Sequence, residues 1–383
     1  MDNRVLSLKN FLDGAVSTYH AVAALSDELK KAGYCPIAEA DEWDLQPGGK
    51  YFLTRNNSSV VAFRIPTETP AGFMMSASHS DRPTFKVKEK GEFVGDYTRL
   101  GVESYGGMII STWLDRPLSI AGRVLVETEN GVASRLVDID RDLLMIPNVA
   151  IHMNREVNNG FKYNAQVDLM PLYGDITAKG SFRKLIADAC GVEEEAIVGN
   201  DLYLYNRMPG TVWGANNEFI SAPQLDDLEC AYASVCALKD LPDQGHVNVC
   251  CVFDNEEVGS TTKQGANSTF LNDVLSRTAA ALGATDAETR AAIKAAQEAP
   301  AEAEQTMVPV VVLTPDPTDE PVQPIVTATP TLAATATPTL VPTAAPTEAP
   351  TPEPTAEPTA EPTAEPTAEP TAEPTEEPVA VVE

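Results

Sequence analysis

Basic residues, cysteine pairs and long apolar runs are all scarce in this 383-residue sequence. It has 27 Lys and Arg residues against 56 Asp and Glu residues, and its formal net charge is −29. Because no basic stripe is present that would release counterions from phosphates, we expect no nucleic-acid partner. No stretch approaches the ~18 continuous apolar residues of a membrane-spanning helix, so we expect no membrane partner either.

The cysteines show no CxxC spacing, which argues against a metal or redox pair. We therefore expect buried free thiols in a reducing compartment. The first residues, MDNRVLSLKNFLDG, contain no basic segment followed by an apolar one, so they predict no signal peptide. Together these features predict a cytoplasmic protein. The six cysteines are Cys35, Cys190, Cys230, Cys236, Cys250 and Cys251.

The last 86 residues differ in composition from the rest. Residues 298–383 contain 16 acidic residues, no Lys or Arg, and 19 of the 30 prolines, with a P-T-A-E repeat that starts at Pro354. A proline at every fourth position prevents helix formation and strand pairing, and the repeated glutamates repel one another. We expect a disordered, polyproline-like tail. Within it, the run MVPVVVL (307–313) is the one place where a strand could join an open sheet edge.

Residues 1–297 alternate between helical and strand patterns. Val22, Leu25 and Leu29 repeat at helical spacing and are followed by Gly33, which predicts a helix that ends there. The runs at 50–56, 59–65 and 73–80 predict successive strands of an α/β sheet. This pattern resumes at 223 with a helix after Asp226 and a buried strand at 247–257. Two further helices are expected, from about residue 268 and from residue 285, where Thr-x-x-Glu is a capping box.

Between about 90 and 222 the pattern changes to short β-type runs broken by Gly, Asn and Pro. The runs at 119–128 and 146–153 are examples. The sequence therefore predicts one α/β domain formed by residues 1–89 and 223–297, interrupted by a β-rich insertion at 90–222.

Three polar motifs follow predicted strands or begin a helix, where ligand sites of open α/β sheets lie. In His79-Ser80-Asp81, the imidazole could bind a metal ion while the carboxylate holds the other ring nitrogen. A surface histidine beside an aspartate explains the same letters without a function. In Leu225-Asp226-Asp227-Leu228, a carboxylate could bridge two cations, or it could simply cap the helix.

The third motif, Asp254-Asn255-Glu256-Glu257, closes an apolar strand. If the chain turns there, one glutamate can bind metal while the other orients water; a solvated strand end is the alternative. Together the three motifs supply the nitrogen and oxygen donors of a two-zinc hydrolase.

At these motifs the sequence resembles the aspartyl aminopeptidase family of metallopeptidases, from near the N-terminus to about Gln297. The family's common H-T-D-S-P, R-L-D-N and D-H-E-E forms appear here as H-S-D-R-P, Q-L-D-D and D-N-E-E, which retain the functional His, Asp and paired Glu. Long matching segments include GVESYGGMIISTWLDRPLSIAGRV, IPNVAIHMNREVNNGFKYN and DNEEVGSTTKQGANSTFL.

The resemblance implies a mixed-sheet α/β catalytic domain that holds two zinc ions, interrupted by a β-rich domain that packs between subunits and helps to cover the active site. It implies that His79 binds one metal ion, Asp226 bridges both and Glu257 binds the other. Glu256 would be the general base that takes a proton from the attacking water, and Asp81 would orient His79.

The resemblance also implies a homo-oligomer that hydrolyses the N-terminal peptide bond of peptide substrates, with Asp or Glu as the residues suggested by the family name. His152 matches a histidine that reaches toward a neighbouring subunit's active site, although a histidine with its hydrogen bonds satisfied inside the β insertion is the alternative.

Two of the family's ligands have no counterpart. The segment IKAAQEA passes directly into the Pro-rich tail, so the Ser-Ala-Asp motif is not found, and no histidine follows His246. We therefore expect a catalytic domain whose C-terminal part is missing, in which each metal ion lacks one protein ligand. Metal binding should be weakened and aminopeptidase activity small or absent. The alternative is a non-catalytic oligomerising or surface-tethered binding protein with the same fold.

Overall fold

The computed structural model describes residues 3–243 and 245–298, which belong to one compact unit of the chain. The expected tail lies outside the described residues except for Glu298, and so does the run at 307–313. Within the described part of the chain, no helix is both long and apolar enough to cross a membrane.

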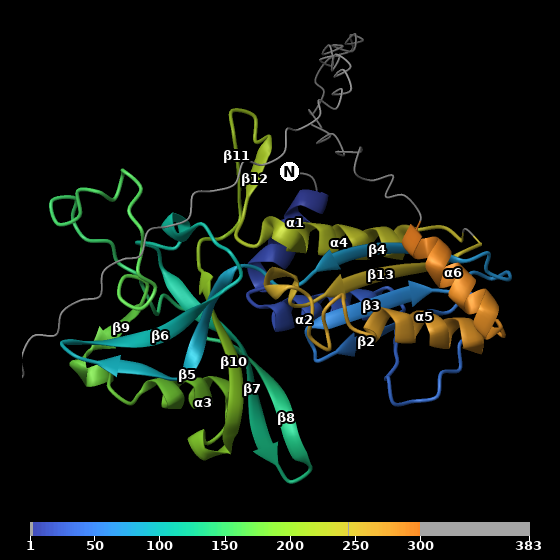
Figure 1. Cartoon of the computed structure of the whole chain (residues 1–383), viewed down its shortest axis with the longest axis horizontal. Coiled ribbons are helices and arrows are strands. Elements are labelled where there is room, and N and C mark those ends of the chain that lie inside the picture. Colours follow the sequence, from blue (N-terminus) through green and yellow to red (C-terminus); the bar gives the residue numbers. More distant parts are fainter. Residues whose placement is uncertain (1–2, 244, 299–383) are drawn as a thin grey trace, which may run out of the picture. The chain divides into compact units, whose positions relative to one another are not determined.

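The first layer is a five-stranded mixed sheet (Figure 1). The pairs β1–β2 and β13–β4 are parallel, while β3 is antiparallel to both β2 and β13. The order across the sheet is β1 (Cys35–Pro36), β2 (Lys50–Arg55), β3 (Ser59–Arg64), β13 (Val247–Phe253) and β4 (Phe73–His79).

Helices cover both faces of this sheet. On one face lie α1 (Asn3–Gly14), α2 (Thr18–Lys31) and α4 (Leu225–Asp240), and on the other lie α5 (Phe270–Ala281) and α6 (Asp286–Glu298). Because β13 is covered on both faces, all seven of its residues are buried, as its mostly apolar sequence predicts, and Asn248 is the one polar residue among them.

The second sheet has six strands and is antiparallel throughout. Helix α3 (Phe182–Cys190) packs against it, and the hairpin of β11 (Thr211–Trp213) and β12 (Phe219–Ser221) follows in the chain. The strand order is β8 (Gly131–Asp138), β7 (Leu118–Thr128), β10 (Ile197–Asn206), β5 (Thr84–Val94), β6 (Tyr97–Tyr105) and β9 (Leu172–Asp175). The domain boundaries at 89/90 and 222/223 stay predictions.

An ionic cluster of the second sheet contacts the first layer. Asp201 of β10 accepts hydrogen bonds from Lys86 Nζ (2.9 Å), from Nε and Nη2 of Arg123 (3.0 Å each) and from the Tyr19 hydroxyl of α2 (3.1 Å). Arg123 also donates to the main-chain oxygen of Asn56, at 2.9 Å. The second sheet is therefore fixed both to a helix and to the β2–β3 turn of the first layer.

The expected helix ends are found. Helix α2 is followed by Gly33 at φ 83°, and its N-cap Ser17 accepts a hydrogen bond from the main chain of His20. At the start of α6, Thr285 Oγ1 accepts from the Glu288 N–H (3.3 Å), while the Glu288 carboxylate accepts from the Thr285 N–H (2.8 Å). This reciprocal pair is the expected capping box.

The β-type run expected at 146–153 is wrong beyond its first residue. Ile146 forms an isolated bridge with Leu114, but residues 147–150 have no regular structure and 151–153 form a turn. Pro147 has no N–H to donate, and Asn148 instead bonds to the Asp115 carboxylate (2.8 and 2.9 Å), which ends the strand pairing.

The expectation for the cysteines is partly wrong. All six are free thiols, but only Cys250 and Cys251 are buried, because they alone lie in the covered strand β13. Cys35 and Cys230 are exposed.

Candidate metal centre

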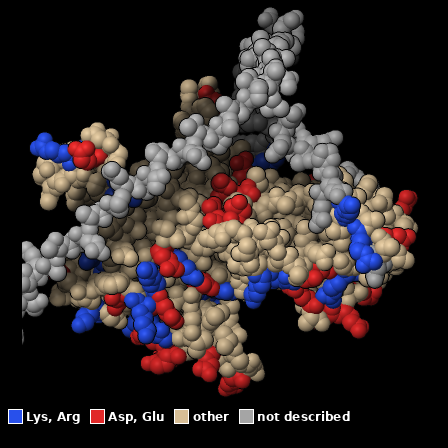
Figure 2. Space-filling view, viewed as in Figure 1, with Lys and Arg blue, Asp and Glu red and all other residues tan. Residues whose placement is uncertain are grey.

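The three sequence motifs meet at one edge of the first sheet. Strands β4 and β13 are parallel neighbours with His79 paired to Phe253, so the chain leaves both at the same edge. The start of α4 brings Asp226 to this edge as well. Figure 2 shows a compact group of acidic side chains on this face, in the region of the loop that follows β13.

The two nitrogens of the His79 ring have different surroundings. Nδ1 lies 3.1 Å from the main-chain oxygen of Asp81 and 3.4 Å from its Oδ1. Nε2 faces carboxylate oxygens of Asp226 (3.3 Å), Glu256 (3.9 Å) and Asp227 (4.0 Å). One nitrogen is thus held by Asp81, and the other points into a group of acidic residues.

His79, Glu256 and Glu257 can each place a ligand atom within 4.8 Å of the other two. Burial, together with the charge of Asp81, raises the pKa of Glu257 to about 6. A cation among these carboxylates would relieve their mutual repulsion. One imidazole nitrogen and several carboxylate oxygens are donors that zinc accepts, so the residues present fit this metal.

Asp81 lies beneath this cluster and is only 3% exposed. Its Oδ1 accepts a hydrogen bond from the main-chain N–H of Glu256 (3.1 Å), and its Oδ2 accepts from that of Glu257 (3.2 Å). Burial lowers the pKa of His79, but the hydrogen bond and charge of Asp81, with the charge of Asp227, outweigh this effect and raise it to about 9.

The loop after β13 turns sharply enough to bring both glutamates to the same side. Asn255 has a left-handed backbone (φ 64°), and a short 3₁₀ turn follows at Glu256–Val258. Asn255 Oδ1 accepts hydrogen bonds from the Thr262 hydroxyl (2.6 Å) and from Gln264 Nε2 (2.8 Å), which hold the turn. Asn255 thus has a structural function at the position where the family's common motif has His.

The sequence allowed Asp226 to be the N-cap of α4 instead of a metal ligand, and the structure shows that it is not the N-cap. The N-cap position of α4 is Gln224, and Asp226 and Asp227 have non-helical φ/ψ values with a cis peptide bond between them. The Asp226 side chain is 87% exposed, whereas Asp227 Oδ2 accepts a hydrogen bond from the main-chain N–H of His79 (3.1 Å).

His152 is the one predicted site residue that the chain does not bring to this cluster. It is exposed in the turn at 151–153. Among the described residues, no hydrogen bond or ion pair joins it to the other five.

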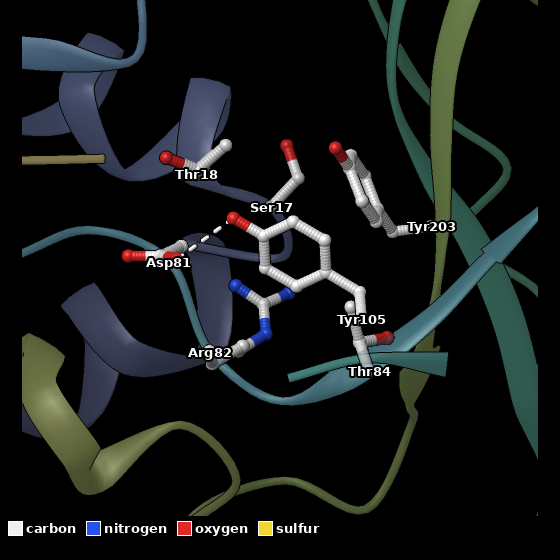
Figure 3. Close-up of a pocket in the computed structure, with 7 residues that line it drawn as sticks. All are labelled: Ser17, Thr18, Asp81, Arg82, Thr84, Tyr105 and Tyr203. Atoms are coloured by element: carbon white, nitrogen blue, oxygen red, sulfur yellow. Dashed lines mark hydrogen bonds between the residues drawn. The ribbon is translucent and has the colours of Figure 1, made fainter. Parts of the chain in front are cut away.

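A small pocket lies behind Asp81 (Figure 3). Arg82 lines it and donates from Nη1 to the main-chain oxygen of Ala15 (3.3 Å) and from Nη2 to that of Val16. Burial lowers the pKa of Arg82 to about 10, although Asp81 partly opposes this effect. Arg82 therefore lies away from the His79 Nε2 group. The pocket is lined by Ser17, Thr18, Asp81, Arg82, Thr84, Tyr105 and Tyr203.

Sequence reasoning did not identify Tyr105 or Asp227. Tyr105 donates from its hydroxyl to Asp81 Oδ2 (2.8 Å) and accepts from Asn255 Nδ2 (2.7 Å). It belongs to the segment GVESYGG, which matches the family over its whole length and therefore gave no reason to select one residue. Asp227 was read only as part of the motif around Asp226.

Over residues 11–309 the sequence matches the family described as "Aminopeptidase I zinc metalloprotease (M18)". The chain belongs to this family. The match confirms the family predicted from the motifs.

Named relatives support this assignment. A "Probable M18 family aminopeptidase 2" of Clostridium acetobutylicum is 43% identical over 286 residues, which are 72% of this chain and 66% of the relative. A protein of the same name from Stutzerimonas stutzeri is 38% identical over 280 residues, or 70% of this chain and 65% of the relative. The chain thus spans about two thirds of the length of the curated relatives that it matches.

Solved structures give the same fold. The structure titled "Cryo-EM structure of the Ape4 and Nbr1 complex" has a TM-score of 0.69 at 35% identity and covers 72% of this chain and 59% of that one. An mApe1 dodecamer of S. cerevisiae has a TM-score of 0.63 at 27% identity, covering 73% and 66%. The predicted mixed-sheet α/β fold is confirmed.

Proposed function

We propose that this M18 chain is a zinc-dependent aminopeptidase in which His79, Asp226 and Glu257 bind metal and Glu256 is the general base. The observation that carries the proposal is that Asp226 Oδ1 and Glu256 Oε2 lie 3.3 Å and 3.9 Å from His79 Nε2, while Glu257 can place a ligand atom within 4.8 Å of those of His79 and Glu256. Family membership supports the same chemistry. The number of zinc ions, two by the family resemblance, is part of the proposal.

In this proposal some residues hold the metal ion and Glu256 transfers the proton. Zinc, when bound, lowers the pKa of water and polarises a carbonyl group. Glu256 is 56% exposed at the rim of the cluster, so its carboxylate is open to the attacking water. It takes a proton from that water and returns it to the departing amine, a role that typically contributes 10²–10⁴-fold to the rate.

Asp81 supports both sides of this arrangement. Its main-chain oxygen and carboxylate hold Nδ1 of His79, which leaves Nε2 for the metal. The same carboxylate holds the main chain of both glutamates, so the base and a ligand are fixed relative to the histidine.

The substrates would be peptides with a free N-terminus. We propose N-terminal Asp and Glu as the residues to test first, because the family resemblance points to acidic side chains. The proposed compartment is the cytoplasm.

We further propose that the chain forms a homo-oligomer through the loop at 147–168. Val149, Ile151, Met153 and Val167 of this loop are each more than half exposed, which is unusual for apolar side chains that stay in water. His152 lies among them, so the same contact would bring it toward a neighbouring copy's site. The dodecamer named for the S. cerevisiae protein is consistent with assembly in this fold.

The function is tested by measuring zinc content and hydrolysis of short peptides, with N-terminal Asp, Glu and Leu compared. Glu256→Gln keeps the size of the side chain and removes the base, so turnover should fall at least ~10²-fold while zinc content is unchanged. Glu129→Gln, in the exposed turn between β7 and β8, is the matched control and should have wild-type turnover.

Retention of zinc without any turnover would favour the alternative, a non-catalytic oligomerising protein. Turnover that Glu256→Gln leaves intact would refute the assignment of the base.

A further inference from the structure

Tyr105 links the six-stranded sheet to the loops that carry the candidate metal ligands. It is the last residue of β6, and its hydroxyl donates to Asp81 Oδ2 at 2.8 Å, the dashed line in Figure 3. The same hydroxyl accepts from Asn255 Nδ2 at 2.7 Å. One oxygen atom therefore bridges the loop after β4 and the loop after β13.

The hydrogen bond from Tyr105 occupies the last free acceptor position of the Asp81 carboxylate. An ionised carboxylate offers about four lone-pair positions. At Asp81, Oδ1 is used by the Glu256 N–H (3.1 Å) and His79 Nδ1 (3.4 Å), and Oδ2 by the Glu257 N–H (3.2 Å) and Tyr105. Because Asp81 is 3% exposed, solvent has little access to replace a lost donor.

The position of the Tyr105 hydroxyl is itself fixed by the sheet. Tyr105 pairs with Thr84 in the β5–β6 ladder, and its ring makes an edge-to-face contact with Tyr203 of β10 at 5.5 Å. The next residue, Gly106, packs so closely on the site that a Cβ built there would lie 2.9 Å from Glu257 Oε2. The end of β6 thus contacts the site at two successive residues.

We propose that Tyr105 is a positioning residue for the metal centre, acting through Asp81. By holding Oδ2 it prevents rotation of the carboxylate, and this keeps the Glu256–Glu257 main chain and the His79 ring in one arrangement. Tyr105 donates to none of the predicted ligands, so its effect passes through Asp81 and Asn255. The expected effect on zinc binding rests on the proposed function, whereas the hydrogen bonds of Tyr105 do not depend on it.

The test uses Tyr105→Phe in the full chain, with Tyr205→Phe as the matched control. Tyr205 also donates from its hydroxyl to an aspartate, Asp138 Oδ1, at 2.8 Å, but it lies outside the candidate site. Both variants keep the ring and lose one such bond, so a general loss of stability affects both.

Zinc and cobalt(II) titrations measure the link to the metal. We expect Tyr105→Phe to weaken zinc binding about 10–100-fold, which is the usual effect of losing a residue that holds a metal ligand in place through hydrogen bonds. It should also change the visible spectrum of bound cobalt, while Tyr205→Phe leaves both as in the wild type. Equal affinity in wild type and Tyr105→Phe, or equal weakening in both variants, would overturn the proposal.

If the wild type binds no zinc, the proposed function fails, but the positioning role of Tyr105 can still be tested. Hydrogen exchange of the metal-free protein provides that test. The amides of Glu256 and Glu257 should exchange at least tenfold faster in Tyr105→Phe than in the wild type, and at the wild-type rate in Tyr205→Phe. Unchanged exchange at these two amides in Tyr105→Phe would overturn the positioning role.

Discussion

Asp201→Asn should reveal how strongly the second sheet, and its contact with α2, depend on one partly buried charge. The substitution keeps the shape of the side chain and one acceptor oxygen, but it removes the only negative charge that the described structure places in hydrogen-bond contact with both Lys86 and Arg123. It also disturbs the bond from Tyr19, on whose ring the Arg123 guanidinium lies at 4.4 Å.

The magnitude follows from burial. The side chains of Asp201 and Arg123 are 23% and 11% exposed, so the pair lies between a surface ion pair and a fully buried one. Surface pairs contribute about 0–1 kcal/mol, and breaking a buried pair costs about 3–5 kcal/mol. We expect Asp201→Asn to lower the free energy of unfolding by about 2–3 kcal/mol, as the intermediate burial implies.

Urea unfolding at pH 7 measures this change, as a fall of roughly 1 M in the midpoint. Asp188→Asn is the control, because Asp188 pairs with Lys184 on an exposed face of α3 and should have no measurable effect. A change below about 0.5 kcal/mol for Asp201→Asn, or one equal to the control, would refute the reasoning.

The pH dependence gives a second check on the same residue. Burial raises the pKa of Asp201, but the hydrogen bonds and charges of Lys86 and Arg123 outweigh it, and the net pKa is lowered. The contribution to stability is therefore present above the unfolded value of about 4 and is lost as pH falls through the lower folded value. The difference between wild type and Asp201→Asn should shrink in that acidic range and stay constant above it.

Three further substitutions test separate parts of the structure. Gly106→Ala should weaken zinc binding about tenfold, because its Cβ would meet Glu257 at 2.9 Å, whereas Gly107→Ala has no neighbour within 4 Å and should bind as wild type. Burial raises the pKa of Asp254 to about 6, so ionising this carboxyl group costs more in the folded than in the unfolded protein. As pH rises from 4 through 6, the free energy of unfolding of metal-free wild type should fall by about 3 kcal/mol relative to that of Asp254→Asn, measured by urea unfolding. Phe270→Ala should cost about 3–5 kcal/mol in the same assay, since the ring is fully buried.

The elements that the sequence predicted well are those with a local cause. The capping box at Thr285 and the glycine stop at Gly33 depend on residues a few positions apart, and both are found. The buried strand β13 could be predicted because a mostly apolar strand, with both its faces apolar, requires cover on both sides. The run at 146–153 failed because its apolar residues looked like a strand, while Asn148 is held by Asp115, 33 positions earlier.

The candidate site divides in the same way. His79, Asp226 and the paired glutamates were visible because strand ends and helix starts of an α/β sheet gather ligands, and the structure brings them together. Tyr105 was not visible, because its contact with Asp81 spans 24 residues and depends on how the second sheet lies against the first. Arg82 is the Arg of H-S-D-R-P, where the family's common motif has Ser, and its bond to the main-chain oxygen of Ala15 shows where its charge lies.

The second sheet contributes directly to the arrangement of the candidate metal ligands. Asp81 is buried and its carboxylate is held in part by a hydroxyl from β6, so the arrangement of the candidate ligands depends on residues of both sheets. The ionic cluster at Asp201 holds the second sheet to helix α2 at a separate point. We therefore expect a change at either contact to alter zinc binding. Zinc titration of Tyr105→Phe and Asp201→Asn tests this expectation at the two contacts.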